Sequence, residues 1–212
     1  MVMRSVLTLV VVLAAAVVAG CTTVSQGKPS GTTTVEATAS SDSAPPSTSG
    51  QKLPYAGAPK VDDPLDTTRF QQDPCLALTA DQATSLTLPA TGKPRTMPFG
   101  KACEWNNPND TGSVTVHFLD RNPYGLSAEY QAHKDGKAAL FEVLPPIEGY
   151  PAVATDVVDG RDQGLCTVVV GVSDEIAFEV PITQSQANIG SKDPCQIAAM
   201  VAGMALETMK KD

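Results

Sequence analysis

The sequence predicts an α+β fold: a single domain in which one antiparallel β-sheet is packed by helices on one face and held by two disulfides. Three observations predict it. Short β-rich segments separated by polar turns follow one another through the second half of the chain, as in successive hairpins. The last stretch is helical in pattern and mostly apolar, so it needs a sheet to cover it. Four cysteines lie between residues 75 and 195.

Two helix starts are predicted at the beginning of this domain. Asp73-Pro74-Cys75 places an N-capping aspartate before a proline, which is favoured in the first turn of a helix. Thr79 and Gln82 have the spacing of a capping box, which indicates a second helix that continues to about Leu88.

Strands are predicted where β-branched and apolar residues cluster. A short one at 103–105 ends at the turn-rich loop 106–110. Within 113–119, apolar and polar residues alternate, and His117 falls on the polar face, where we expect it to be solvated. Further strands are expected at 141–144, at 153–158, and, after the polar turn 159–164, at 165–172 and 176–180.

Two more helices complete the prediction. Asn122-Pro123 is expected to cap a helix that carries Tyr130 and a solvated His133 and ends near Gly136. A second Asp-Pro-Cys, at 193–195, opens the apolar helix, which runs to about residue 209. We expect this last helix to be buried against the sheet rather than exposed as a ligand groove or partner face.

The N-terminus has the layout of a lipoprotein signal peptide over residues 1–20: one cation, an apolar run and small residues at its end. Val18-Ala19-Gly20-Cys21 resembles the bacterial lipobox. That resemblance implies cleavage before Cys21, a diacylglycerol on its thiol and a further acyl chain, such as palmitate, on the new amino terminus. Two acyl chains give stable anchoring. The expected location is the extracytoplasmic face of the cell membrane.

Residues 21–59 are predicted to be a disordered tether that begins at the lipidated cysteine. The segment is rich in Ser, Thr and Pro and has almost no large apolar residue, so burial cannot offset its ordering entropy. As a coil it would span about 35 Å. Residues 60–212 form the extracytoplasmic domain. With a net charge of −8, the chain is a poor candidate for nucleic-acid binding, which needs cations.

The domain's cysteines are Cys75, Cys103, Cys166 and Cys195. An even number in an exported domain indicates two disulfides, for which three pairings are possible. We favour Cys75–Cys103 and Cys166–Cys195 because they close the shortest loops. A metal site is the weaker interpretation, because no Cys-x-x-Cys or Cys-His spacing is present.

No catalytic set is recognisable in the sequence. A Gly-x-Ser-x-Gly elbow is missing, and no free thiol is expected. Asp156, Asp159 and Asp162 lack the spacing of a calcium loop and are expected to lie in a plain turn. Trp105, the single tryptophan, is either a core residue or a stacking platform for a sugar or lipid. No cofactor is expected.

Short motifs occur along the chain in a distinctive order: a lipobox, a Ser/Thr-rich tether, Asp73-Pro74-Cys75, Cys103-Glu104-Trp105, Gly149-Tyr150-Pro151-Ala152-Val153, Cys166 in a strand, and Pro194-Cys195 opening the last helix. This order resembles the actinobacterial lipoproteins of domain-of-unknown-function family 3558, which include the LprB-like and LprC-like proteins. The resemblance implies paired structural cysteines and an actinobacterial envelope, and it brings no catalytic residues.

Three functions follow from these expectations. The first is a non-enzymatic module that binds a lipid, a glycan or a small molecule between sheet and helices. The second is an accessory or sensory subunit that docks onto a membrane or cell-wall protein. An envelope hydrolase ranks last, because no nucleophile, base and orienting residue can be named.

Overall fold

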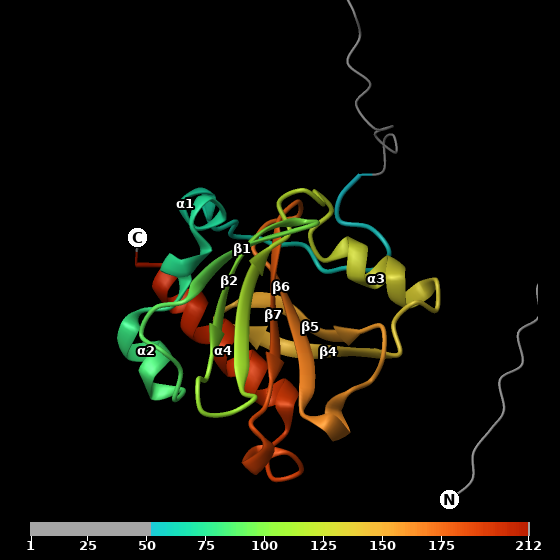
Figure 1. Ribbon diagram of the computed structural model, residues 1–212. Helices are drawn as coiled ribbons and strands as arrows, with labels where there is room; N and C mark the ends of the chain where they lie inside the picture. The colour runs from blue at the N-terminus through green and yellow to red at the C-terminus, as the bar shows by residue number, and fades with distance from the viewer. Residues whose placement is uncertain (1–51, 212) are drawn as a thin grey trace, which may run out of the picture. The chain divides into compact units, whose positions relative to one another are not determined.

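The computed structural model describes residues 52–211 (Figure 1). The signal peptide, the lipobox with Cys21 and the tether as far as residue 51 lie outside the described residues. The centre of the fold is one seven-stranded antiparallel sheet with the strand order β1-β2-β3-β7-β6-β5-β4. Its strands are β1 (Lys93–Met97), β2 (Gly100–Asn106), β3 (Ser113–Phe118), β4 (Leu140–Ile147), β5 (Tyr150–Asp156), β6 (Leu165–Gly171) and β7 (Ala177–Thr183). The predicted α+β class is confirmed.

The helical segments are α1 (Thr68–Gln72), η1 (Pro74–Ala77), α2 (Ala80–Ser85), α3 (Ser127–Lys134), η2 (Arg161–Gln163), η3 (Gln186–Asn188) and α4 (Pro194–Met209). The predicted starts of η1, α2 and α4 and the predicted end of α4 are confirmed, whereas Asn122-Pro123 does not cap a helix: α3 begins at Ser127, after Leu126. Asp73 caps the first 3-10 turn by accepting a hydrogen bond from the Cys75 backbone N–H, and the capping box of Thr79 and Gln82 is formed. None of the helices in the described range is long and apolar enough to span a bilayer.

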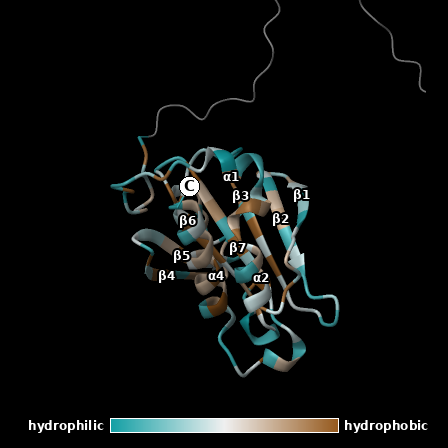
Figure 2. Ribbon diagram, turned by 90° about the vertical axis from the view of Figure 1, so that its left-hand side faces the viewer, coloured by the Kyte–Doolittle hydropathy of each residue, from teal (hydrophilic) through white to brown (hydrophobic). Residues whose placement is uncertain are grey.

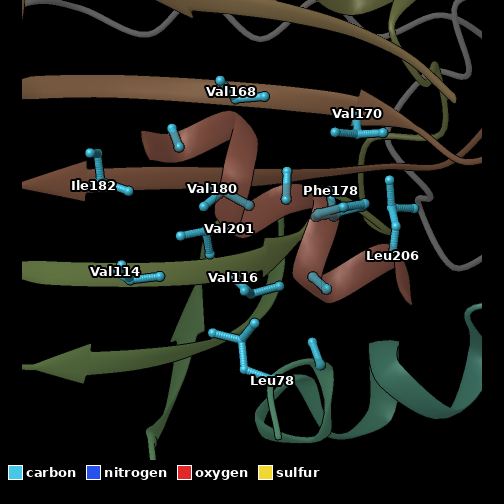
Figure 3. Packing of buried hydrophobic residues seen from close by; sticks show 14 of the residues in the cluster. Leu78, Val114, Val116, Val168, Val170, Phe178, Val180, Ile182, Val201 and Leu206 are labelled. Atoms are coloured by element: carbon cyan, nitrogen blue, oxygen red, sulfur yellow. The ribbon is translucent and has the colours of Figure 1, made fainter. Parts of the chain in front are cut away.

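The main core lies between α4 and the middle of the sheet (Figures 2 and 3). Val201 and Leu206 of α4 face Val168, Phe178 and Val180 of the central strands, and all five side chains are fully buried. The predicted burial of α4 is therefore confirmed. Because these side chains fill the space between helix and sheet, binding of a ligand inside that space, as the sequence analysis expected, finds no support.

A second, smaller cluster occupies the opposite face of the same sheet. Val169 lies between Val168 and Val170 on β6, yet it packs with Leu126 and Tyr130 of the α3 segment. Helices therefore cover both faces, and the expectation of helices on one face only was wrong. α3 also encloses part of the polar face of β3. His117 is 1% exposed as a result, and the expectation that it is solvated was wrong too.

Both disulfides tie helical segments to the sheet. Cys75 of η1 bonds Cys103 of β2, and Cys166 of β6 bonds Cys195 in the first turn of α4. The pairing agrees with the prediction from the shortest loops. Cys103 and Cys166 are buried in the core, so each bond connects a helix start to the sheet interior.

Prolines interrupt both edges of the sheet. β1 carries Pro94 between Lys93 and Arg95, and β4 continues through Pro145-Pro146, where the sequence predicted that it would stop. The register of β4 on β5 shifts at these prolines. Proline lacks the N–H that a further strand would need, so each edge resists pairing with another chain.

Residues 52–59, which the sequence analysis placed in the tether, contact the domain. The Tyr55 backbone N–H donates a hydrogen bond to Ser127 Oγ over 3.0 Å, and the Tyr55 ring packs edge-on against Tyr124. Ala58 packs against the cluster beneath α3. The ordered part of the chain therefore starts before residue 60, because this segment gains apolar and hydrogen-bonding contacts that its composition does not reveal.

Candidate functional site

The start of α4 is the centre of the candidate site. Asp193 caps the helix by accepting a hydrogen bond from the Cys195 backbone N–H over 2.8 Å, and the Cys166–Cys195 bond fixes the first turn to β6. Two surface hollows meet at Asp193, one polar and one apolar. We call the two together the α4 groove.

The polar half of the α4 groove lies between the β5–β6 turn and the loop before α4. It has a volume of about 680 Å³ and is lined by Asp159, Arg161, Asp162 and residues 190–194. Arg161 donates two side-chain hydrogen bonds to Asp159, of 2.9 and 2.7 Å. These bonds hold the pKa of the Asp159 carboxyl below its ordinary value. Among the described residues, none forms an ion pair with the exposed Lys192 in the same hollow.

The apolar half lies between the edge strand β4 and α4 and has a volume of about 510 Å³. Leu144, the two prolines and Ile147 form one wall, and Ala199 leaves room on the helix side. Glu142 stands at one end, 3.8 Å from the guanidinium of Arg161. Arg161 therefore connects the two halves, and the groove presents a charged end and an aliphatic end to one bound molecule.

A second cluster of ionisable groups lies on the other face of the sheet. His117 of β3 and Glu179 of β7 are cross-strand partners, and Nδ1 of the imidazole lies 2.7 Å from Oε1 of the carboxylate. Glu129 approaches from α3. Burial of Glu129, and then the negative charge of Glu179, raise its pKa to about 7. His117 is buried, whereas the Glu179 side chain is 24% exposed, so the cluster lies at the edge of the second core. Ionisation of Glu129 in this surrounding disfavours the folded state.

The acidic turn after β5 does not gather its carboxylates around one point. Asp156 accepts hydrogen bonds from the backbone N–H and the hydroxyl of Thr167, while Asp159 pairs with Arg161. Burial raises the pKa of the Asp156 carboxyl above its ordinary value. Within residues 52–211, three or more His, Cys, Asp or Glu side chains placed to hold a metal ion are not found.

The other residues singled out from the sequence are structural. Trp105 is 1% exposed, and its ring packs so closely against Gly92 that a Cβ there would lie 2.6 Å from Cε2. It is a core residue, and a stacking platform at the surface is not what the structure shows. His133 is exposed, as expected, and stacks on Phe141 with 4.2 Å between ring centroids.

Sequence reasoning missed the contribution of Arg161 and of Pro145-Pro146 to one site. The turn 159–164 and the end of β4 were each recognised, but 15 positions separate Arg161 from Pro146 along the chain. Only the pairing of β4 with β5 and the position of α4 bring them together. A usable signal was the proline pair itself, because two prolines within an apolar segment are typical of an edge strand.

The fold and the two disulfides define a disulfide-bonded α+β domain, and the α4 groove is its candidate site. A family model described as "Protein of unknown function (DUF3558)" matches residues 16–208, and the chain therefore belongs to this family. Comparisons with curated proteins and with solved structures give no significant match.

Proposed function

We propose that this protein is a lipid-anchored lipoprotein on the extracytoplasmic face of an actinobacterial cell membrane, and that its domain binds an amphipathic molecule in the α4 groove without transforming it. The lipobox at 18–21 supports the anchor. The two disulfides support an oxidising compartment. The observation that carries the binding function is the groove itself, in which charged and aliphatic halves meet at Asp193.

The chemistry of the groove fits a lipid or a lipid with a glycan head. The aliphatic half removes hydrocarbon from water, which is the main driving force for binding an apolar tail. The charged half offers Arg161, Lys192 and several carboxylates to a polar head that carries both hydrogen-bond donors and acceptors. Pockets with an apolar lining and a few polar groups are typical of small-molecule sites.

Replacing Cys21 by Ala is expected to leave the signal peptide uncleaved and to remove the mass of the acyl chains from the N-terminal peptide, because the thiol is the proposed acceptor of the lipid. The mass of the N-terminal peptide measures this. Thr23→Ala, just outside the lipobox, is the matched control and should keep the acyl mass. A natural protein whose N-terminal peptide carries no acyl mass would contradict the anchor.

Native mass spectrometry of the domain, exported to an oxidising compartment of a related host and purified gently, is expected to show two disulfides and a retained adduct. Ala199→Glu, which places a charge in the aliphatic half, should reduce adduct occupancy at least tenfold. Ala187→Glu makes the same change on the exposed η3 turn, outside the groove, and should leave occupancy unchanged. An adduct equally abundant in both variants would place the ligand elsewhere.

A second candidate function is supported by the exposed valines of the β5–β6 turn. Val157 and Val158 are adjacent in the chain, and both side chains are exposed, at 79% and 75%. Adjacent exposed apolar side chains are typical of a protein interface. A domain that carries no adduct would favour docking onto a membrane or cell-wall protein through this turn, and crosslinking in intact cells from position 158 would test it.

A further inference from the structure

The β1–β2 hairpin ends in an exposed apolar turn, Met97-Pro98-Phe99. Phe99 is 54% exposed and lies outside both core clusters. The other four phenylalanines belong to those clusters and are buried or half-buried. The turn is held in place, because the backbone N–H of Arg121 donates a hydrogen bond of 3.0 Å to the Phe99 carbonyl. An aromatic ring is therefore displayed at a fixed position at one end of the sheet.

The chain enters the domain at this same end. In Figure 1 the segment that precedes α1 and the β1–β2 hairpin both lie at the upper end of the sheet. The contacts agree: Tyr55 packs against Tyr124, which follows Arg121 by three residues. Residues 22–51 thus join Cys21 to the end of the domain that displays Phe99.

Basic side chains flank the exposed ring, although the whole chain is acidic. Lys101 follows Phe99 by two residues, the backbone of Arg121 bonds the Phe99 carbonyl, and both basic residues are exposed. Lys101 Nζ donates a hydrogen bond to the Gln72 carbonyl over 3.0 Å. The neighbouring Asp120 turns one carboxylate oxygen into the protein, where it is buried. Long cationic side chains beside an exposed aromatic ring are typical of surfaces that contact lipid headgroups.

We propose that this end of the domain rests on the bilayer surface, with Phe99 inserted among the headgroups and with Lys101 and Arg121 against lipid phosphates. The chain as a whole carries a net charge of −8, so the proposed contact relies on Phe99 and these two cations rather than on a general attraction to an anionic membrane. The proposal rests on the proposed anchor only in one respect: tethering supplies the high local concentration that a weak surface contact needs.

The test replaces the natural anchor by an artificial one. Residues 21–212 with Cys21→Ser and an N-terminal histidine tag are tethered to vesicles of phosphatidylcholine and phosphatidylglycerol through a nickel-chelating lipid. The four remaining cysteines are in disulfides, so Phe99→Cys provides one reactive thiol for an environment-sensitive fluorophore. Val143→Cys is the matched control, because Val143 is 59% exposed on the opposite edge strand, β4.

At position 99 we expect a blue shift of the emission on vesicles and quenching by spin-labelled lipids, and at position 143 neither. Adding Lys101→Glu and Arg121→Glu to the Phe99→Cys protein should reduce the blue shift of its emission at least twofold. Equal emission at both positions, shifted or not, would overturn the proposal. A fluorophore at 99 that stays aqueous on vesicles but is shielded in native membranes would assign the turn to a membrane protein and would also overturn it. Because the tag replaces the lipid, the result does not depend on Cys21.

Discussion

Replacing both Cys166 and Cys195 by Ala is expected to lower the free energy of unfolding by about 3–4 kcal/mol. The bond closes a loop with a sequence separation of 29, and loss of the crosslink returns that loop's conformational freedom to the unfolded chain. Alanine avoids placing a hydroxyl in the core. Denaturant unfolding of the domain under oxidising conditions measures the loss.

Cys75→Ala with Cys103→Ala is the matched comparison. Its loop is almost equal, with a sequence separation of 28, so the entropic loss should be the same within about 1 kcal/mol. A larger loss of unfolding free energy for the Cys166/Cys195 variant would indicate that this bond also stabilises the packing of α4 on β6. A loss below about 1 kcal/mol for either pair would contradict a structural role for that bond.

Glu129→Gln is expected to raise the free energy of unfolding by about 2–3 kcal/mol above pH 7. Burial and the charge of Glu179 raise the pKa of Glu129 to about 7, so its ionised form disfavours the folded state. Below about pH 4.5 the carboxyl is protonated in both states, and there is no penalty. Between about 4.5 and 7 the unfolded state loses the proton first, so the stability of the natural protein falls as pH rises.

The measurement is denaturant unfolding at several pH values between 4 and 8. The Glu129→Gln curve should converge with the natural one at low pH, separate from it as the pH rises above about 4.5, and show the full difference above pH 7. Glu207→Gln, on an exposed position of α4, should leave the pH dependence unchanged. Asp156, whose pKa is also raised by burial, contributes a slope of the same sign that the variant keeps. If the unfolding free energies of the Glu129 variant and the natural protein changed with pH in parallel, Glu129 would not be the group whose raised pKa causes the pH dependence.

Local sequence signals predicted most of the fold. Both Asp-Pro-Cys motifs start helical segments, because a side-chain cap and a proline act within one turn. β1 was not predicted, since Lys93-Pro94-Arg95-Thr96-Met97 has neither alternation nor β-branched runs and depends on pairing with β2. α1 was missed for a similar reason: five residues carry too little periodicity.

The candidate site was less predictable than the fold. The alternation of polar and apolar residues on β3 correctly placed His117 on the opposite face of the sheet from Val116 and Phe118. Alternation does not show, however, that another element of the chain covers the face on which His117 lies. The partner of His117 lies 62 residues away on β7, and strand order alone decides that pairing. Arg161 of η2 and Glu142 of β4 likewise meet only because β4 pairs with β5, the strand that leads into η2.

The two disulfides join cysteines that are neighbours along the chain: 75 with 103, then 166 with 195. When a polypeptide emerges into an oxidising space from its N-terminal end, each thiol meets its native partner before a wrong one arrives. Oxidation in order of emergence therefore gives the native bonds without reshuffling. Cys21 is the exception, because it emerges before all of them. Conversion of its thiol to the proposed thioether removes the one sulfur that could capture Cys75, so lipidation would also protect the accuracy of folding.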